Sequence, residues 1–120
     1  MVTFDQFLEM GLALPEAGEQ VTWETRVTLR VGGKIFAMGT PGTGEVTVKA
    51  SKADQAELLA AEPEVFSSAP YVGRHGWVLV RLAGVDGGEL AELMAEAWRS
   101  VAPKRLVKDF DASGGTGATL

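Results

Sequence analysis

The Gly32-Gly33 pair, between two segments of alternating apolar and polar residues, constrains the fold more than any other feature of the sequence. Two glycines between strand-like segments favour a two-residue type I′ turn, because both central positions of that turn need a positive φ. The pair therefore predicts an antiparallel hairpin over residues 26–39. Its turn also sets the register, and the predicted partners are Val31 with Lys34, Leu29 with Phe36, and Val27 with Met38.

This register divides the hairpin into two faces, because successive side chains of a strand point to opposite sides. The predicted apolar face carries Val27, Leu29, Val31, Phe36 and Met38. The predicted opposite face carries Arg26, Thr28, Arg30, Ile35, Ala37 and Gly39. A third strand over 45–50 follows a glycine-containing turn, and we expect it to place Val46 and Val48 beside Met38 and Phe36, with Lys49 on the opposite face.

The rest of the chain predicts an α+β fold, a single antiparallel sheet of about five strands with helices packed on one face. Further strands are expected at 19–24 and 77–82, and residues 63–76 are read as irregular. Helices are expected near 3–14, 51–62 and 86–101, with Thr3 and Ser51 as candidate N-caps and the third helix beginning at Asp86 or Gly87. In the second helix, the inward residues are predicted to be Ala53, Ala56, Leu59 and Ala60.

One domain is predicted over residues 1–108, with 109–120 as a flexible tail rich in Gly, Ser, Thr and Ala. The predicted core is Val21, Trp23, Val27, Leu29, Phe36, Met38, Val46, Val48, Leu93 and Trp98.

Composition excludes several classes of protein. The chain has no cysteine, which removes disulfides, zinc–thiolate sites and thiol nucleophiles. No apolar run approaches the ~18 residues of a membrane span, and the N-terminus has no basic leader. We therefore expect a cytoplasmic protein with no membrane partner, and a monomer is the favoured state. The net charge of −5 weighs against nonspecific binding to nucleic acid.

No catalytic or cofactor motif is complete. A phosphate-binding P-loop reads GxxxxGK followed by Ser or Thr and opens a helix, whereas VGGKIF opens a strand. His75 is the only histidine and lacks a partner at metal-ligand spacing. Ser67 and Ser68 lack a nucleophile elbow. We therefore predict no catalytic residues, no metal and no cofactor, and a protein that is not an enzyme.

Charge distribution is more informative than net charge. Acidic residues dominate the predicted helices, and Glu89, Glu92 and Glu96 are read as a solvated helix face. The predicted open face of the sheet instead carries Arg26, Arg30, Lys49 and Arg81, against Glu24 and Glu45. Such a face is either a binding surface or the solvated side of an antiparallel sheet, and the sequence favours neither.

Five segments, in their order and spacing, resemble the MmcQ/YjbR family of small proteins: LPEAGEQVTW, VGGKIFA, VTVKAS, PYVGRHGWVLVRL and EAWRSVAPKRLV. The resemblance spans about residues 4–107. It implies a CyaY-like fold, with one antiparallel sheet and helices on one side. It also implies DNA binding, through similarity to a double-wing transcription-factor domain, and it brings no established catalytic residues.

Three functional hypotheses follow. The first is DNA binding through the open face, with candidate residues Arg26, Arg30, Lys34, Lys49, Arg74, His75 and Arg81. The second is a protein-interaction adaptor that uses the same face, with another protein as partner. The third is frataxin-like iron binding by Asp5 and Glu9 on the first helix.

Overall fold

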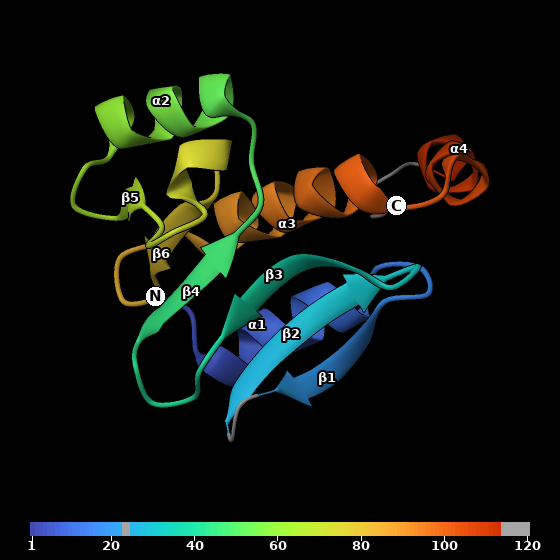
Figure 1. The fold of residues 1–120 in the computed structure, drawn as a ribbon, viewed down its shortest axis with the longest axis horizontal. Coiled ribbons are helices and arrows are strands. Elements are labelled where there is room, and N and C mark those ends of the chain that lie inside the picture. Colours follow the sequence, from blue (N-terminus) through green and yellow to red (C-terminus); the bar gives the residue numbers. More distant parts are fainter. Residues whose placement is uncertain (23–24, 114–120) are drawn as a thin grey trace.

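The computed structural model describes residues 1–22 and 25–113. This part of the chain forms one antiparallel six-stranded sheet and four α-helices (Figure 1). The strands are β1 (Gly18–Thr22), β2 (Arg26–Val31), β3 (Lys34–Gly39), β4 (Glu45–Val48), β5 (Phe66–Ser68) and β6 (Val78–Arg81). The helices are α1 (Phe4–Leu12), α2 (Lys52–Ala61), α3 (Gly87–Val101) and α4 (Lys104–Ala112), with a 3-10 turn, η1 (Gly73–His75).

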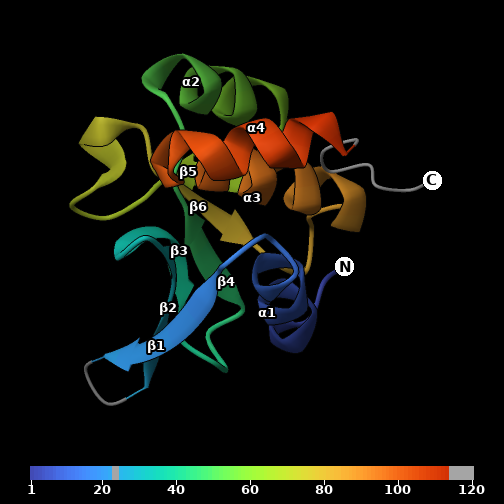
Figure 2. The same ribbon diagram turned by 90° about the vertical axis from the view of Figure 1, so that its right-hand side faces the viewer.

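The sheet order is β1-β2-β3-β4-β6-β5, and this architecture confirms the predicted α+β class. Helices α1 and α3 cover one face of the sheet, and α2 packs beside β5 at one end. Figure 2 shows α1 on one side of the sheet, while the segment between β5 and β6 (yellow) projects on the side away from α1. The sheet has six strands rather than about five because β5, with three residues, is too short for an alternating pattern to reveal it.

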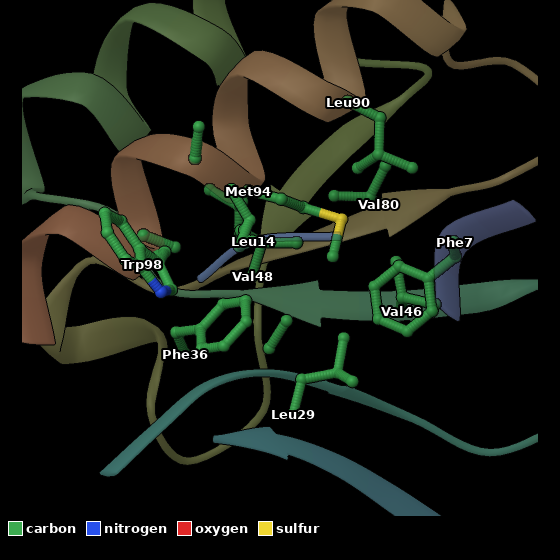
Figure 3. Close-up of a cluster of buried hydrophobic side chains, with 14 of the residues drawn as sticks. Phe7, Leu14, Leu29, Phe36, Val46, Val48, Val80, Leu90, Met94 and Trp98 are labelled. Carbon is green, nitrogen blue, oxygen red and sulfur yellow. The ribbon is translucent and has the colours of Figure 1, made fainter. Parts of the chain in front are cut away.

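The core lies between the sheet and α3, and its largest member is Trp98 (Figure 3). The Trp98 side chain is completely buried, and its indole Nε1 donates a hydrogen bond to the Pro15 carbonyl at 3.0 Å. Its ring also packs against Phe110 of α4, with centroids 4.9 Å apart. Trp98 therefore joins α3, α4 and the turn after α1, which lie far apart in the sequence.

The hairpin turn is confirmed, but most of the predicted register is wrong. Gly32 and Gly33 have φ values of +59° and +80°, and Val31 pairs with Lys34 as expected. A β-bulge then shifts the register, so that Leu29 pairs with Ala37, Thr28 with Met38 and Val27 with Gly39. Phe36 is the extra residue of the bulge, and both Phe36 and Ala37 are fully buried, while Met38 pairs with Thr47 of β4. An extra residue in one strand reverses the facing of every later residue, so Met38 lies on the side away from the helices.

The same shift changes the partners of β4 but not its inward residues. Val46 pairs with Gly39 and Val48 with Ala37, rather than with Met38 and Phe36 as predicted. Val46 and Val48 are nevertheless buried in the core, as expected.

Five predicted core residues besides Val46 and Val48 are confirmed, and three others are not. Val27, Leu29, Phe36 and Trp98 are buried with them, and Leu93 is partly buried against the core. Met38 is only half-buried, on the other face of the sheet. Val21 is 57% exposed because it lies on the edge strand β1, beyond the area covered by α1 and α3. The predicted core position of Trp23 lies outside the described residues.

The predicted helix starts are confirmed by capping hydrogen bonds. The side chains of Thr3, Ser51 and Asp86 each accept a bond from the backbone N–H three residues later. Such caps satisfy N–H groups that have no partner within the helix.

The predicted inward face of α2 is wrong. Ala53, Ala56 and Ala60 are exposed and Leu59 is half-buried, whereas Gln55 is buried. The Gln55 Nε2 atom donates to the backbone carbonyls of Gly73 and Trp77, at 2.8 and 2.9 Å. Gln55 thus fixes the segment between β5 and β6. The spacing of apolar residues along a helix could not identify a polar residue in that role.

Helix α4 continues through residue 108, where the sequence suggested that the domain ends. Leu106 is buried, Val107 and Phe110 pack against the core, and Arg99 of α3 pairs with Asp111 at 2.6 Å. The predicted flexible tail therefore contributes residues 109–112 to a helix, and residues 114–120 of that tail lie outside the described residues.

Candidate functional site

The open face is the side of the sheet away from α1 and α3. Along β4 and β6, buried Val46, Val48, Val78 and Val80 face the helices, so the alternate residues face the other way. The side chains of the open face include Arg26, Thr28, Arg30, Met38, Glu45, Thr47, Leu79 and Arg81. This face combines arginines with an apolar and hydroxyl-bearing centre, and none of the helices described above covers it (Figure 2).

A hollow of about 320 Å³ lies on this face, at the ends of β3 and β4. Met38, Thr47 and Leu79 supply its floor from three neighbouring strands. The remaining lining residues are Arg26, Gly39, Thr40, Thr43, Glu45, Pro70, Tyr71 and Val72. We name it the open-face hollow. It exists because the bulge in the β2–β3 hairpin turns Met38 outward and because the 70–72 segment stands beside the strands.

Three of the seven predicted site residues lie on the open face. Arg26 lines the open-face hollow, and Arg81 is opposite Glu45 in the register of β4 and β6. Arg30 is half-buried, and its Nε donates to the Thr28 hydroxyl at 3.0 Å. None of these guanidinium groups lies within 4.0 Å of a carboxylate among residues 1–22 and 25–113.

The other four predicted site residues are not among the strand side chains that form this face. Lys34 is opposite Val31, whose side chain is buried toward the helices, so Lys34 lies at the hairpin tip on the helix side. The prediction that Lys49 faces the open side is wrong, because β4 ends at Val48 and the chain turns there toward α2. Arg74 donates from Nε to Nε2 of His75 at 3.3 Å, and neither lines the open-face hollow.

Lys49 and His75 instead line a second hollow of about 340 Å³. Leu93, Glu96 and Ser100 of α3 form one side of it, and Ala50, Ser51 and Asp54 at the start of α2 form another. The carboxylates of Asp54 and Glu96 offset the positive charge of Lys49 in this space. The seven basic candidates thus do not form one surface.

Tyr71 is the open-face residue that sequence reasoning missed. Its side chain is 94% exposed, and its φ of +65° is a conformation that residues other than glycine rarely adopt. The signal in the sequence was the motif PYVGRHG, a tyrosine after a proline in a segment without a hydrophobic pattern. The ring is exposed because of the path that the segment takes in the folded protein, so the sequence motif alone could not identify Tyr71 as an open-face residue.

The acidic residues of the helices are spread along the part of the chain that the structure describes. No group of three or more His, Asp or Glu side chains there could hold an ion. The pKa of Glu89, in the first turn of α3, is raised above its usual value. Partial burial is the main cause, followed by a hydrogen bond and charge repulsion from Glu62, and then by repulsion from Asp86 and Glu92.

The raised pKa of Glu89 predicts a pH dependence of stability. The Glu89 carboxyl binds a proton more readily in the folded state than in the unfolded state. Glu89 therefore destabilises the fold increasingly as pH rises from its pKa in the unfolded state to its pKa in the folded state. We expect Glu89→Gln to gain stability over the parent at pH 7, and this gain to shrink as pH is lowered toward 4. Melting temperatures across that range test this. Glu57→Gln removes the same charge from an exposed position of α2, and an equal effect there would contradict the explanation.

The fold defines the class of protein: an α+β domain with one antiparallel sheet, helices on one face and an uncovered opposite face. The model of the YjbR family matches residues 12–100, and the chain belongs to this family. Every helix of the described residues is too short or too polar to cross a membrane.

Known relatives agree with this assignment. Uncharacterized proteins of Mycobacterium bovis and Mycobacterium tuberculosis are 32% identical to the chain over 133 residues, covering 96% of it and all of each relative. The fold is also similar to the crystal structure of a Deinococcus radiodurans protein with the family-model domain DUF419. That likeness has a TM-score of 0.79 at 21% identity, and it covers 91% of this chain and 88% of the other.

Proposed function

We propose that the protein binds nucleic acid through the open face. The observation that carries the proposal is the grouping of Arg26, Arg30 and Arg81 on one face, with no carboxylate of the described residues within 4.0 Å of their guanidinium groups. Guanidinium groups that form no ion pair with the described carboxylates are suited to phosphate oxygens. The family resemblance also implies DNA binding.

Distances within the sheet are compatible with contacts to several phosphates. Arg26 and Arg81 lie on β2 and β6, which are separated by β3 and β4. Three strand spacings put their backbones ~14 Å apart. Arg30 is four residues from Arg26 along the same strand, a backbone separation of ~13 Å. The three side chains therefore form a triangle across the sheet rather than a single point of charge.

The rest of the molecule would orient such a complex. Helices α1, α2 and α3 carry Asp5, Glu9, Asp54, Glu57, Glu89, Glu92 and Glu96 against Lys52 and Arg99. Repulsion between these carboxylates and phosphates disfavours binding through the helices. Helix α4 differs, because it carries Lys104, Arg105 and Lys108, and its exposed lysines provide a control for charge alone.

The first test is anisotropy of a labelled DNA duplex at low salt, titrated over a range of salt concentrations. With about three phosphate contacts, the logarithm of affinity should fall with the logarithm of salt concentration with a slope of about −3. Arg26→Ala with Arg81→Ala should weaken binding to all sequences alike and flatten the slope by about two units.

The matched control is Lys104→Ala with Lys108→Ala, which removes the same charge from α4. We expect this variant to retain nearly all affinity and the parent slope. If both double variants weaken DNA binding equally, the loss of affinity reflects net charge alone, and this would contradict binding by the open face. Absence of binding to the duplex and to either of its separate strands at low salt would remove nucleic acid as the ligand.

A second candidate function is a protein-interaction adaptor, and the apolar centre of the same face favours it. Met38, Leu79 and Tyr71 border the open-face hollow with charged residues around them, an arrangement typical of protein interfaces. The adaptor predicts a partner that remains bound after nuclease treatment. It also predicts that Leu79→Lys abolishes capture, whereas the double variant of Arg26 and Arg81 retains it.

We further propose that the protein acts by binding and not by catalysis. The proposal is supported by the groups that line the open-face hollow, which offer one arginine, one glutamate, threonines and a tyrosine without a recognisable nucleophile–base pair. Saturable binding of ATP at micromolar concentration, or hydrolysis of a nucleotide, would overturn this.

A further inference from the structure

We infer that Tyr71 stacks on an unpaired base at the open-face hollow, so that single-stranded nucleic acid is the preferred ligand. The inference rests on the proposed function, because it assigns a ligand class to the same face. Its evidence is separate from the arginines: the exposure and backbone conformation of Tyr71, the hydrogen bonds that hold its segment, and the composition of the hollow.

Tyr71 is presented to solvent in an unfavourable backbone conformation. The ring is 94% exposed although an aromatic side chain gains stability when it is buried. The residue also has a φ of +65°, which is sterically unfavourable for a side chain other than glycine. Strained residues of this kind cluster at functional sites, where the surrounding structure maintains them.

The segment that carries Tyr71 is held firmly on both sides. The Val72 N–H donates to the Pro70 carbonyl at 2.6 Å and the Gly73 N–H to the Ala69 carbonyl at 2.9 Å. The buried Gln55 amide adds bonds to the carbonyls of Gly73 and Trp77. Tyr71 therefore extends from a fixed turn, and stacking on it requires little further ordering of the backbone.

The open-face hollow offers the contacts that a base needs. Met38 and Leu79 give an apolar floor, and Thr40 and Thr47 bring hydroxyl groups that donate or accept hydrogen bonds. Arg26 and Glu45 add a donor and an acceptor at its rim. Its volume of about 320 Å³ is at the small end of the range for ligand sites, as expected for one base rather than a larger group.

Single strands satisfy this site better than duplexes. In a duplex the bases are paired and stacked on one another, so Tyr71 could reach a free ring face only at a duplex end. In a single strand every base presents a π-face, and a base that stacks on an aromatic side chain can expose its hydrogen-bonding edge. Arg26 and Arg81 would then contact flanking phosphates.

The experiment compares three ligands of equal length by anisotropy: a mixed-sequence 12-nucleotide strand, the blunt duplex of that sequence, and an abasic strand with the same phosphates. We expect the single strand to bind at least about tenfold more tightly than the other two at low salt. Tyr71→Asn removes the ring while keeping a residue that tolerates positive φ. It should weaken binding to the strand about 5- to 150-fold, the range for loss of one base–aromatic stack, without changing the salt slope.

Tyr71→Phe, which keeps the ring, should bind like the parent, and melting curves confirm that both variants are folded. The outcomes separate this inference from the proposed function. If duplex and abasic ligands bind as tightly as the strand, or Tyr71→Asn has no effect, the inference is wrong. Sensitivity to loss of Arg26 and Arg81 would still support the proposed function. If none of the three ligands binds, both fail.

Discussion

Replacing Trp98 by alanine should cost about 3–5 kcal/mol of folding free energy, the range for truncating a buried aromatic. Its side chain is fully buried between α3 and the sheet, and it packs against Phe110. The change also leaves the Pro15 carbonyl without the indole N–H that donates to it. For a domain of this size the melting temperature should fall by roughly 10–20 °C, measured by circular dichroism.

Two variants define the cause of this loss. Trp98→Phe retains a ring but not the N–H group, so its stability should lie between those of the parent and Trp98→Ala. Val21→Ala changes an exposed side chain on β1 and should alter stability by less than about 0.5 kcal/mol. If Trp98→Ala melts like the parent, the packing of α3 on the sheet is wrong.

Gly76→Ala should also destabilise the fold strongly. We expect the free energy of unfolding to fall by about 2–6 kcal/mol, from backbone strain and overpacking together. Gly76 follows η1 and has a φ of +107°. A Cβ atom there would lie 2.3 Å from the Ala50 carbonyl oxygen and 2.8 Å from the Ser51 carbonyl carbon. These are backbone atoms, which cannot rotate away as a side chain could. The measurement is chemical denaturation of the purified variant.

Two other glycines separate the causes. Gly18→Ala meets no atom within 4 Å and needs no positive φ, so it should be nearly neutral. Gly42 has a φ of +89° and also meets no atom within 4 Å, so Gly42→Ala reports backbone strain alone, about 1–3 kcal/mol. Equal losses for Gly76→Ala and Gly42→Ala would contradict the close approach of η1 to the start of α2.

Much of the candidate site could not be inferred without the fold. The sequence correctly placed Arg26, Arg30 and Arg81 on one face, because period-two alternation determines facing within a regular strand. It misplaced Lys49 because alternation says nothing once a strand has ended. It missed Tyr71 and Gln55 because both depend on the path of residues 69–77, which show no hydrophobic periodicity. Tyr71 is exposed on that segment, and Gln55 is buried where it binds the backbone of that segment.

Elements governed by local chemistry could be predicted from the sequence alone. The Gly32-Gly33 turn needs positive φ, the N-caps at Thr3, Ser51 and Asp86 satisfy neighbouring N–H groups, and the spacing of apolar residues places Trp98 inward on α3. Four features depend on the tertiary structure: the bulge at Phe36, the outward turn of Met38, the exposure of Val21 and the packing of α4. These features minimise the free energy of packing between segments distant in sequence, and no local pattern of residues records that balance.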